Sequence, residues 1–398
     1  MKAVIMAAGE STRTFPLTVT RPKALLPIAN KTILERQLDS LVGIVDGVVL
    51  IVGYRHEMIR ERMGDRYAGI GIEYVVQQER KGTGHAVLQC KDLIAEPFLA
   101  MNGDDLWEPA DLAAVAAEEQ AALAKVVDDP RLYGIYEVDR NDCVVRLVEK
   151  PKEVFSNLAN IGVYKFTPEV FDVLEHTPPS ERGEIEITSA IQTLAERGCF
   201  KVVRAQGYWL AIGYPWHLLD ANQFILENHL HVESYGTVSP LADLNGVVSI
   251  GQGTVIKAGA VIEGPVLIGE RCEVGPNCYL RPGTTLGNGC KVGQGSEVKN
   301  SILMDGAKVP HLSYVGDSVL GEGVNLGCGT VVANFRHDGK THRSEYKGEL
   351  VDTGRRKFGA IIGDHVHTGI HTSIYPGRKL WPHTNTLPGE IVRGDKRD

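Results

Sequence analysis

The chain has 398 residues, of which 43% are apolar, and a formal net charge of −8. This length favours two domains over one. The negative charge argues against nucleic acid or an anionic membrane as a main partner, although local basic clusters could bind small phosphate compounds. The seven cysteines include no CxxC pair, so we expect a reducing environment, no disulfide framework and no zinc site. A cytoplasmic location is the default expectation.

The first part of the chain alternates short apolar runs with helical patterns. Residues 2–8, 47–53 and 98–104 are strand-like runs, and residues 32–43 and 82–94 lie between them with helical spacing. Strands that are buried on both faces and separated by helices predict an α/β domain of Rossmann-like type with a mostly parallel sheet. Ligands of such sheets bind beyond the carboxyl ends of the strands. The polar residues that follow the first and third runs are therefore candidates for a site.

The second part of the chain repeats every six residues. Glycine often follows the aliphatic residue of each repeat, as in Ile250-Gly251 and Ile268-Gly269. A period of six matches neither a helix nor a simple strand and indicates a left-handed parallel β-helix of hexapeptide repeats. A glycine-rich linker would not space its aliphatic residues in this way. Nine successive positions follow the period without a miss: Ile250, Ile256, Ile262, Ile268, Val274, Leu280, Leu286, Val292 and Val298.

A change in composition predicts the domain boundary. Of the 44 glycines, 18 lie between Gly246 and Gly329. We expect a first domain over 1–230, a linker over 231–245 and a β-helix domain over 246–398. Residues 216–230 read as a helix that joins the two parts. Residues 334–357 break the six-residue period and are rich in charge, so we expect an inserted functional loop there.

The stretch AAGESTRTFPLTVTRPK, residues 7–23, follows the first predicted strand. Backbone N–H groups between a strand and a helix can donate to phosphate, and the stretch fits neither GxGxxG nor GxxxxGK[ST]. It resembles the AAGxGTR and proline-lysine signature of sugar-1-phosphate nucleotidyltransferases. With a β-helix behind it, the whole chain resembles the archaeal-type bifunctional enzymes that join nucleotidyl transfer to amino-sugar-1-phosphate acetylation. The resemblance covers essentially all 398 residues.

The resemblance implies roles for residues of the first domain. Arg13 would neutralise the departing pyrophosphate, Lys23 would bind the α-phosphate or the sugar phosphate, and Asp104 would bind Mg²⁺, a hard ion that prefers oxygen ligands. Gln77 matches the residue that reads a pyrimidine edge. The implied nucleotide-binding residues are Ala8, Gly9, Glu10, Ser11, Thr12, Gln77, Gly82 and Thr83, and the implied sugar-phosphate contacts are Gly103, Glu149, Lys150 and Asn160.

Two positions depart from the family pattern. Ser11 stands where relatives carry glycine, which is tolerable if its φ angle stays negative. Ala211 stands where relatives carry the second metal ligand, Asp or Asn, so Asp104 would hold Mg²⁺ with water and phosphates. Asp105 would point to the opposite face of an extended segment and be a poor substitute. Three alternative explanations of Ala211 stay open: tolerated variation, a weakened first activity, or a deliberate substitution. Arg21 has no role in this scheme and is interpreted as a surface charge.

A second site is implied in the β-helix. The run HLSYVGD resembles the AGHLTYLGD segment of glucosamine-1-phosphate acetyltransferases, whose histidine is the general base, here His311. A neutral imidazole can take the proton of the attacking amine near pH 7. Phe335 and Ile370 replace a tyrosine and a serine that are frequent in relatives. The implied substrate contacts are Arg281 and Lys299 with the sugar phosphate, and Tyr314, Asn325 and Asn334 with the sugar.

The leading hypothesis is a bifunctional enzyme of nucleotide-sugar synthesis that uses UTP or dTTP, sugar 1-phosphates, Mg²⁺ and acetyl-CoA. Related acetyltransferase sites form between neighbouring solenoids, so a homotrimer is expected, without nucleic-acid or membrane partners. One alternative keeps the nucleotidyltransferase and makes the β-helix structural or regulatory. Another is a non-catalytic sugar-nucleotide sensor or assembly subunit, supported by Ala211 alone. Three cysteines share one phase of the repeat and are expected inside the coil: Cys272, Cys278 and Cys290.

Overall fold

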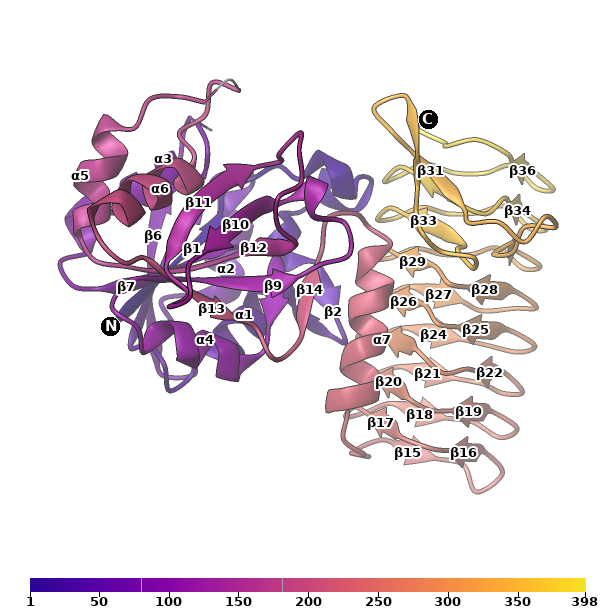
Figure 1. Cartoon of the computed structure of the whole chain (residues 1–398). Helices are drawn as coiled ribbons and strands as arrows, with labels where there is room; N and C mark the ends of the chain where they lie inside the picture. The colour runs from indigo at the N-terminus through magenta and orange to yellow at the C-terminus, as the bar shows by residue number, and fades with distance from the viewer. Residues whose placement is uncertain (80, 181) are drawn as a thin grey trace. The chain divides into compact units, whose positions relative to one another are not determined.

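A computed structural model describes the whole chain except Arg80 and Glu181 (Figure 1). The chain forms two compact units that alternate along the sequence. The first unit comprises Met1–Glu10, Pro22–Leu25 and Ile33–Ala211, and the second comprises Ser11–Arg21, Leu26–Thr32 and Ile212–Asp398. Packing thus assigns short N-terminal segments to the second unit. The domain ranges expected from the sequence, 1–230, 231–245 and 246–398, remain a prediction.

The first unit is built on a mixed ten-stranded sheet with the order β11-β10-β12-β7-β1-β4-β6-β5, to which β9 and β13 add beside β12. Its central strands β7, β1, β4 and β6 are parallel, and three of them are the apolar runs that the sequence predicted. Strand β12 runs antiparallel to β7 and β9. The strands are β1 (Lys2–Ala7), β4 (Gly47–Val52), β5 (Arg66–Tyr67), β6 (Ile70–Val76), β7 (Phe98–Asn102), β9 (Ala121–Val126), β10 (Gly134–Val138), β11 (Val144–Glu149), β12 (Leu158–Phe166) and β13 (Lys201–Arg204).

Helices cover both faces of this sheet, as the continuous apolar strands require. Within β1, Val4 packs in the core beneath α3, α5 and α6, whereas its neighbours Ala3 and Ile5 pack beneath α1, α2 and α4. This alternation follows from the two-residue period of a strand. The helices are α1 (Ile33–Leu41), α2 (His56–Met63), α3 (Thr83–Leu88), α4 (Pro109–Ala116), α5 (Glu169–His176) and α6 (Ile187–Arg197). The expected helix over 82–94 is therefore shorter, and a 3₁₀ turn, η4 (Lys91–Leu93), follows it.

The second unit contains a left-handed parallel β-helix with three flat sides, each of which is a parallel sheet (Figure 1). The first sheet holds β15 (Thr237–Val238), β18 (Val255–Ile256), β21 (Glu273–Val274), β24 (Lys291–Val292) and β27 (Lys308–Val309). The second holds β16 (Asp243–Asn245), β19 (Val261–Glu263), β22 (Tyr279–Leu280), β25 (Glu297–Lys299), β28 (Tyr314–Gly316), β30 (Val331–Val332), β34 (Ser373–Ile374) and β36 (Ile391–Val392). The third holds β17 (Val248–Ile250), β20 (Val266–Ile268), β23 (Thr284–Leu286), β26 (Ile302–Leu303), β29 (Val319–Leu320), β33 (Ala360–Ile362) and β35 (Arg378–Leu380).

The aliphatic residues of the repeat fill the interior of the coil. Ile250 pairs with Ile268 and Ile268 with Leu286, so three six-residue repeats complete one coil. All nine aliphatic residues of the unbroken period are buried in one core. The three cysteines that were expected inside the coil lie in the same core, which confirms that prediction.

One helix and one hairpin are added to the solenoid. Helix α7 (His217–His229) runs alongside the coils (Figure 1). Its Asn222 donates to the carbonyl of Gly283 at 3.1 Å and accepts from the Thr285 hydroxyl at 2.9 Å. The charged insertion folds into a β-hairpin, β31 (Arg343–Tyr346) and β32 (Glu349–Asp352). Two further short strands of this unit, β2 (Pro27–Ile28) and β3 (Lys31–Thr32), form a separate antiparallel pair.

The expectation of cysteines without a disulfide is wrong for one pair. Cys143 and Cys199 form a disulfide, with their Cα atoms 5.2 Å apart. An antiparallel bridge brings them together, because the N–H of Val144 donates to Phe200 and that of Val202 donates to Asp142. The two cysteines are 56 residues apart in the chain, so no local spacing signals the pair.

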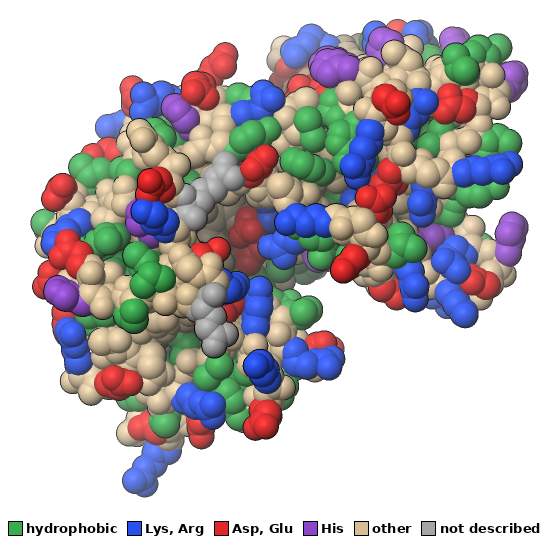
Figure 2. Space-filling model, turned by 90° about the horizontal axis from the view of Figure 1, so that it is seen from above, with side chains coloured by type: hydrophobic (Ala, Val, Ile, Leu, Met, Phe, Trp, Pro, Cys, Tyr) green, Lys and Arg blue, Asp and Glu red, His purple; other side chains and the backbone are tan. Residues whose placement is uncertain are grey.

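The surface carries charges of both signs. Figure 2 shows lysine and arginine side chains intermixed with aspartate and glutamate on the face in view. Within the described residues, no helix combines the length and the apolar composition needed to cross a membrane.

Candidate active sites

The ends of β1 and β7, which pair in parallel, carry the first group of predicted residues. Gly103 and Asp104 directly follow β7. A Cβ atom at Gly103 would lie 2.6 Å from the carbonyl oxygen of Met6 in β1, so this close approach requires glycine. The ammonium of Lys23, whose side chain is buried, lies 2.7 Å from Oδ2 of Asp104. The structure therefore brings together the implied phosphate-binding lysine and the implied metal ligand.

Ala211 lies next to this pair in the fold. Strands β8 (Asp105–Trp107) and β14 (Trp209–Ala211) pair antiparallel and place Ala211 opposite Asp105. The Asp105 carboxylate accepts a hydrogen bond from the Trp209 indole at 3.0 Å, and its backbone carbonyl accepts one from Gln37 at 2.8 Å. Asp105 is thus held by other partners, and the expectation that it does not replace the missing ligand remains a prediction.

The donor set at this place fits Mg²⁺ only when substrate supplies further oxygens. Asp104 offers one carboxylate, and the methyl group of Ala211 offers no oxygen atom. Within the described residues, no group of three or more His, Cys, Asp and Glu side chains could hold a metal ion. Mg²⁺ commonly binds one or two carboxylates and completes its shell with water and substrate phosphates, so the residues present fit a substrate-bound ion.

Gln77 has a partner that sequence reasoning missed. The buried amide of Gln77 lies with Nε2 2.9 Å from Nδ1 of His85, which follows in the GTGHA segment. Burial and, second, the nearby Lys81 lower the pKa of His85. The imidazole is therefore neutral near pH 7 and Nδ1 can accept from the amide, which fixes the orientation of Gln77.

We expect the affinity for the nucleoside triphosphate to fall in acid through His85. A histidine whose folded pKa is depressed keeps its neutral-state interactions above the unfolded value, about 6.5, and loses them as the pH falls through the lower folded value. Protonated Nδ1 cannot accept from Gln77, so KM for the triphosphate should rise. Steady-state assays from neutral to acidic pH measure this. In His85→Asn the acid-dependent rise should disappear, and an unchanged profile would contradict the role.

Gly82 and Thr83 begin α3 and lie against residues 185–187. Gly82 has a φ angle of +103°, and a Cβ atom there would lie 2.6 Å from the carbonyl oxygen of Ile185. The Thr83 hydroxyl accepts a hydrogen bond from the N–H of Ile187 at 3.2 Å. Gly82 and Thr83 are therefore packed against the residues that lead into α6.

The implied sugar contacts lie on β11 and β12. Glu149 ends β11, and burial raises the pKa of its carboxyl, with Lys150 acting in the opposite direction. Lys150 is exposed. Asn160 donates to the Tyr164 hydroxyl at 2.8 Å and accepts from the N–H of Gly162 at 3.1 Å. Asn160 is thus held in place at an irregularity of β12.

The condition set for Ser11 is not met. Ser11 has a φ angle of +55° and lies in the left-handed region, where a side chain costs on the order of 1 kcal/mol or more. Its carbonyl accepts three hydrogen bonds, from the N–H and hydroxyl of Thr14 and from the hydroxyl of Thr18. These bonds hold the strained residue in place, at a φ angle that glycine would adopt without steric cost.

The rest of this segment packs within the second unit. The Arg13 guanidinium lies over the ring of Tyr214, 5.9 Å from its centre, and the Thr12 hydroxyl lies 3.4 Å from that of Tyr346. Arg13 itself is exposed. The interpretation of Arg21 as a surface charge is wrong: the residue is only 7% exposed.

The predicted acetyltransferase residues lie on neighbouring coils of the second sheet. Arg281 follows β22, Lys299 ends β25, and Gly316 takes the same place on β28, paired with Lys299. A Cβ atom at Gly316 would lie 2.5 Å from Nδ2 of Asn334 and 2.6 Å from the hydroxyl oxygen of Tyr314. Asn334 donates to that hydroxyl at 3.0 Å. Glycine therefore leaves the room in which Tyr314 and Asn334 meet.

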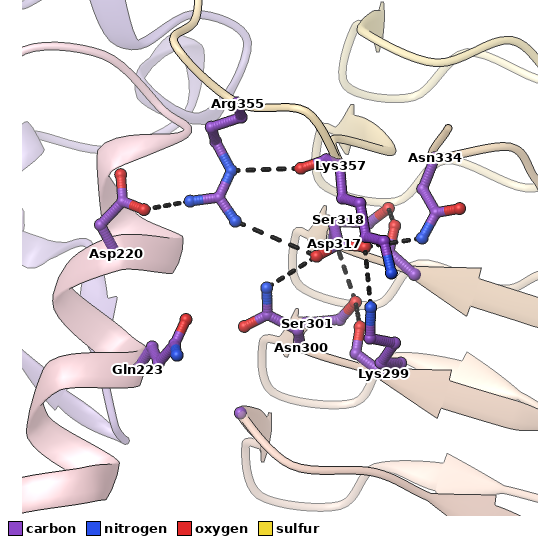
Figure 3. A network of polar contacts seen from close by, with 12 residues as sticks. Asp220, Gln223, Lys299, Asn300, Ser301, Asp317, Ser318, Asn334, Arg355 and Lys357 are labelled. Carbon is purple, nitrogen blue, oxygen red and sulfur yellow. Dashed lines mark hydrogen bonds and ion pairs between the residues drawn. The ribbon is translucent and has the colours of Figure 1, made fainter. Parts of the chain in front are cut away.

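A buried carboxylate that sequence reasoning missed organises this group (Figure 3). Asp317 is only 2% exposed. It accepts hydrogen bonds from Nδ2 of Asn300 at 2.7 Å and from Nδ2 of Asn334 at 2.6 Å. The Lys299 ammonium lies 3.7 Å from it and the Arg355 guanidinium 4.0 Å. Asp317 thus fixes both the implied phosphate-binding lysine and the implied sugar-binding asparagine.

The charged insertion adds cations to the same cluster. Arg355 forms an ion pair with Asp220 of α7 as well as with Asp317 (Figure 3). Burial is the first cause that lowers the pKa of Lys299, and Lys357 and Arg281 lower it further while Asp317 opposes them. Several cations thus surround one buried carboxylate. This excess of positive charge suits a phosphate dianion.

We expect Lys357→Ala to weaken binding of the amino-sugar phosphate. Removing one cation from the cluster should raise KM for glucosamine 1-phosphate by about tenfold, the size of one charge-assisted hydrogen bond, with a smaller change in kcat. Release of the CoA thiol measures the rate. Lys308→Ala, on a different sheet of the β-helix, is the matched control. Equal effects of both variants would contradict a local role.

The remaining predicted residues lie nearby along the same coils. His311 precedes β28 and is exposed. Asn325 forms isolated backbone β-bridges with Lys308 and with His367, which lie in the adjacent coils. Phe335 is 50% exposed and Ile370 52% exposed, so these two departures from the family pattern lie at the surface of the chain.

Comparison with known proteins decides the family. A family model described as nucleotidyl transferase matches residues 2–228, and one described as GMPPB C-terminal domain matches residues 262–385. "Bifunctional protein GlmU" of Methanococcus maripaludis is 47% identical over 98% of this chain and 93% of its own length. The chain belongs to the family of bifunctional sugar-1-phosphate nucleotidyltransferase/acetyltransferases. It is therefore a bifunctional transferase, with nucleotidyltransferase and acetyltransferase activities.

Other relatives agree with membership of this bifunctional family. The "Bifunctional sugar-1-phosphate nucleotidylyltransferase/acetyltransferase" of Sulfurisphaera tokodaii is 40% identical over 99% of this chain and 98% of its own length. A solved structure of UDP-glucose pyrophosphorylase complexed with UDP-glucose has a TM-score of 0.54 and 26% identity, covering 57% of this chain and 99% of that one. The full-length matches favour the bifunctional hypothesis over a merely structural β-helix or a sensor.

Proposed function

We propose that this enzyme transfers a nucleotidyl group from UTP or dTTP to a sugar 1-phosphate and releases pyrophosphate. We also propose that it acetylates glucosamine 1-phosphate, or its galactosamine epimer, with acetyl-CoA. The observation that carries the second part is the cluster of Lys299 and Arg355 around buried Asp317, with Lys357 beside Lys299. A purely structural coil has no need of such a cluster. Together the two activities would serve the synthesis of a UDP-N-acetylglucosamine type of product.

In the first reaction, the sugar phosphate oxygen attacks the α-phosphorus in line and pyrophosphate leaves, with no covalent enzyme intermediate. Lys23 neutralises the attacking or the α-phosphate, and Arg13 the departing pyrophosphate. Backbone N–H groups of residues 8–12 donate to the triphosphate. Gln77, held by His85, reads a pyrimidine edge, and Glu149 and Asn160 contact the sugar. Mg²⁺ held by Asp104 would supply charge neutralisation of the phosphates when bound.

In the second reaction, the amine of the sugar attacks the thioester carbonyl of acetyl-CoA. His311 takes the proton of the amine as the C–N bond forms, and the C–S bond then breaks to release the CoA thiol. Arg281, Lys299 and Lys357 hold the phosphate of the substrate. Tyr314 and Asn334 contact the sugar and orient the amine, while backbone N–H groups take the place of the serine replaced by Ile370.

A substrate matrix tests the proposal. The full-length enzyme is incubated with Mg²⁺ and UTP or dTTP against glucose, glucosamine and N-acetylglucosamine 1-phosphates, each with and without acetyl-CoA. We expect pyrophosphate to require both a pyrimidine triphosphate and a sugar 1-phosphate. Release of the CoA thiol from acetyl-CoA should require an amino-sugar phosphate and no nucleoside triphosphate. Absence of thiol release with every amino sugar would overturn the acetyltransferase assignment, and absence of pyrophosphate would overturn the choice of nucleotides.

We also propose a cytoplasmic homotrimer assembled through the β-helix, acting on small molecules and not on nucleic acid or membranes. Large apolar side chains on the outside of the coils support an interface. Val331 and Ile391 lie in the same sheet of the coil and are 45% and 48% exposed. Light scattering coupled to size-exclusion chromatography should give three times the mass of the chain. A monomeric mass with full acetyltransferase activity would contradict the proposal.

A further inference from the structure

Arg21, near the end of the signature stretch, is buried against two acidic residues of the β-helix unit. Its guanidinium pairs with Glu322 and lies 2.5 Å from Oδ2 of Asp364. The Asp364 side chain is itself buried, whereas that of Glu322 is 44% exposed. Burial opposes the charge of Arg21, yet the two carboxylates hold its pKa above the ordinary value. The residue is therefore a charged anchor and not a solvated surface cation.

Asp364 also accepts hydrogen bonds from groups other than Arg21. Its Oδ2 atom also accepts the Thr20 hydroxyl at 2.5 Å, and its Oδ1 atom accepts the N–H of Glu322 at 2.8 Å. Asp364 thus joins the end of the signature stretch to the backbone of the coil. Removing one member of such a buried group leaves the others buried without a compensating charge, which is destabilising.

The anchored segment is the one that carries the implied pyrophosphate-binding residue. Residues 11–21 form part of the same compact unit as the β-helix. At the amino end of this segment Arg13 lies over Tyr214, and Thr12 meets Tyr346 of the inserted hairpin. At the carboxyl end of the segment, Arg21 forms ion pairs with Glu322 and Asp364 of the β-helix. Both ends are therefore fixed on residues that belong to the C-terminal part of the chain.

We propose that Arg21 is a positioning residue for nucleotidyl transfer, which holds segment 11–21, and with it Arg13, in place through Asp364 and Glu322. The inference rests on the proposed role of Arg13 in binding the triphosphate. Glu322 lies three residues before Asn325, a predicted contact of the acetyltransferase site. The same coil therefore serves both reactions, as an attachment for one and as a substrate contact for the other.

Three variants of the full-length enzyme test the proposal: Arg21→Ala, Arg21→Lys and Glu322→Gln. Lysine keeps the positive charge but lacks the planar guanidinium whose N–H groups donate to both carboxylates. Glu322→Gln removes the negative charge of the half-exposed partner. We expect KM for the triphosphate to rise roughly tenfold in Arg21→Ala, as for loss of a charge-assisted hydrogen bond, and less in the other two. Acetyl transfer should be unchanged. The double variant of Arg21→Ala and Glu322→Gln should be no worse than Arg21→Ala alone.

Glu270→Gln is the matched control, because Glu270 pairs with Arg271 at 2.7 Å on the surface of the same β-helix. This variant should keep the wild-type KM. Unchanged triphosphate kinetics in the Arg21 variants would overturn the inference, as would an equal loss of both activities, which indicates a purely structural role. Should Arg21→Ala fail to fold, Arg21→Lys and Glu322→Gln decide. Absence of nucleotidyl transfer in the wild-type enzyme would instead count against the proposed function.

Discussion

Replacing His311 with alanine is expected to abolish acetyl transfer and to leave nucleotidyl transfer intact. The imidazole is the proposed acceptor of the amine proton, and loss of a general base lowers a rate by about 10²–10⁴-fold. His311 is exposed and lies at the start of a coil strand, with its backbone carbonyl accepting the Ser313 hydroxyl at 2.7 Å. Alanine keeps that backbone bond, so the coil should fold normally. Release of the CoA thiol and of pyrophosphate, measured on the same preparation, gives both rates.

His231→Ala provides the control, because this histidine is also exposed and lies between α7 and the first coil. It should leave both activities unchanged. An equal loss of both activities in His311→Ala would show that the residue supports the fold or the assembly instead.

Replacing Ala211 with aspartate is expected to strengthen Mg²⁺ binding at the first site. Ala211 is paired with Asp105 across β8 and β14, and Asp104 directly precedes Asp105 in the chain. A second carboxylate there would add an oxygen ligand of the type that Mg²⁺ prefers. The Mg²⁺ concentration for half-maximal nucleotidyl transfer should fall by about tenfold, the lower end of the effects seen when support of a metal site changes. Rates across a metal titration, with saturating substrates, measure it.

Ala211→Val is the matched control, since it adds bulk without an oxygen atom. Mg²⁺ should also raise the melting temperature of Ala211→Asp more than that of the wild type, because a ligand stabilises the folded state that binds it. Identical metal titrations of the wild type and Ala211→Asp would contradict a deficient metal site. Acetyl transfer should be the same in all three proteins.

The architecture could be predicted because burial imposes its period on the sequence. A solenoid must direct one aliphatic residue inward on every side of the coil, so positions such as Ile250, Ile268 and Leu286 report the fold directly. The parallel strands β1, β4 and β7 are buried on both faces and therefore read as continuous apolar runs. The β8–β14 ladder sets Ala211 opposite Asp105, and the place deduced for the second metal ligand remains a prediction. The roles of the predicted site residues remain predictions.

Contacts between distant positions could not be predicted, because no local pattern reports which coil or strand meets which. Arg21 reads as a surface cation until its carboxylate partners, more than 300 residues away in the chain, are known. Asp317 lies in the HLSYVGD motif, but its role in orienting the cluster is visible only in the structure, where Asn300 and Asn334 donate hydrogen bonds to it. Cys143 and Cys199 have no recognisable spacing, and the positive φ angle of Ser11 depends on hydrogen bonds to its carbonyl.

The stacking of the coils has a consequence for where this enzyme can tolerate change. Each coil contacts only the coils before and after it, so opening a terminal coil breaks one interface and opening an interior coil breaks two. Strands β22, β25 and β28, which present the cation cluster, all have paired strands on both sides. Strand β15 lies at an end of its sheet. Opening of the solenoid should therefore begin at its end coils, away from the coils that carry the substrate-binding cluster.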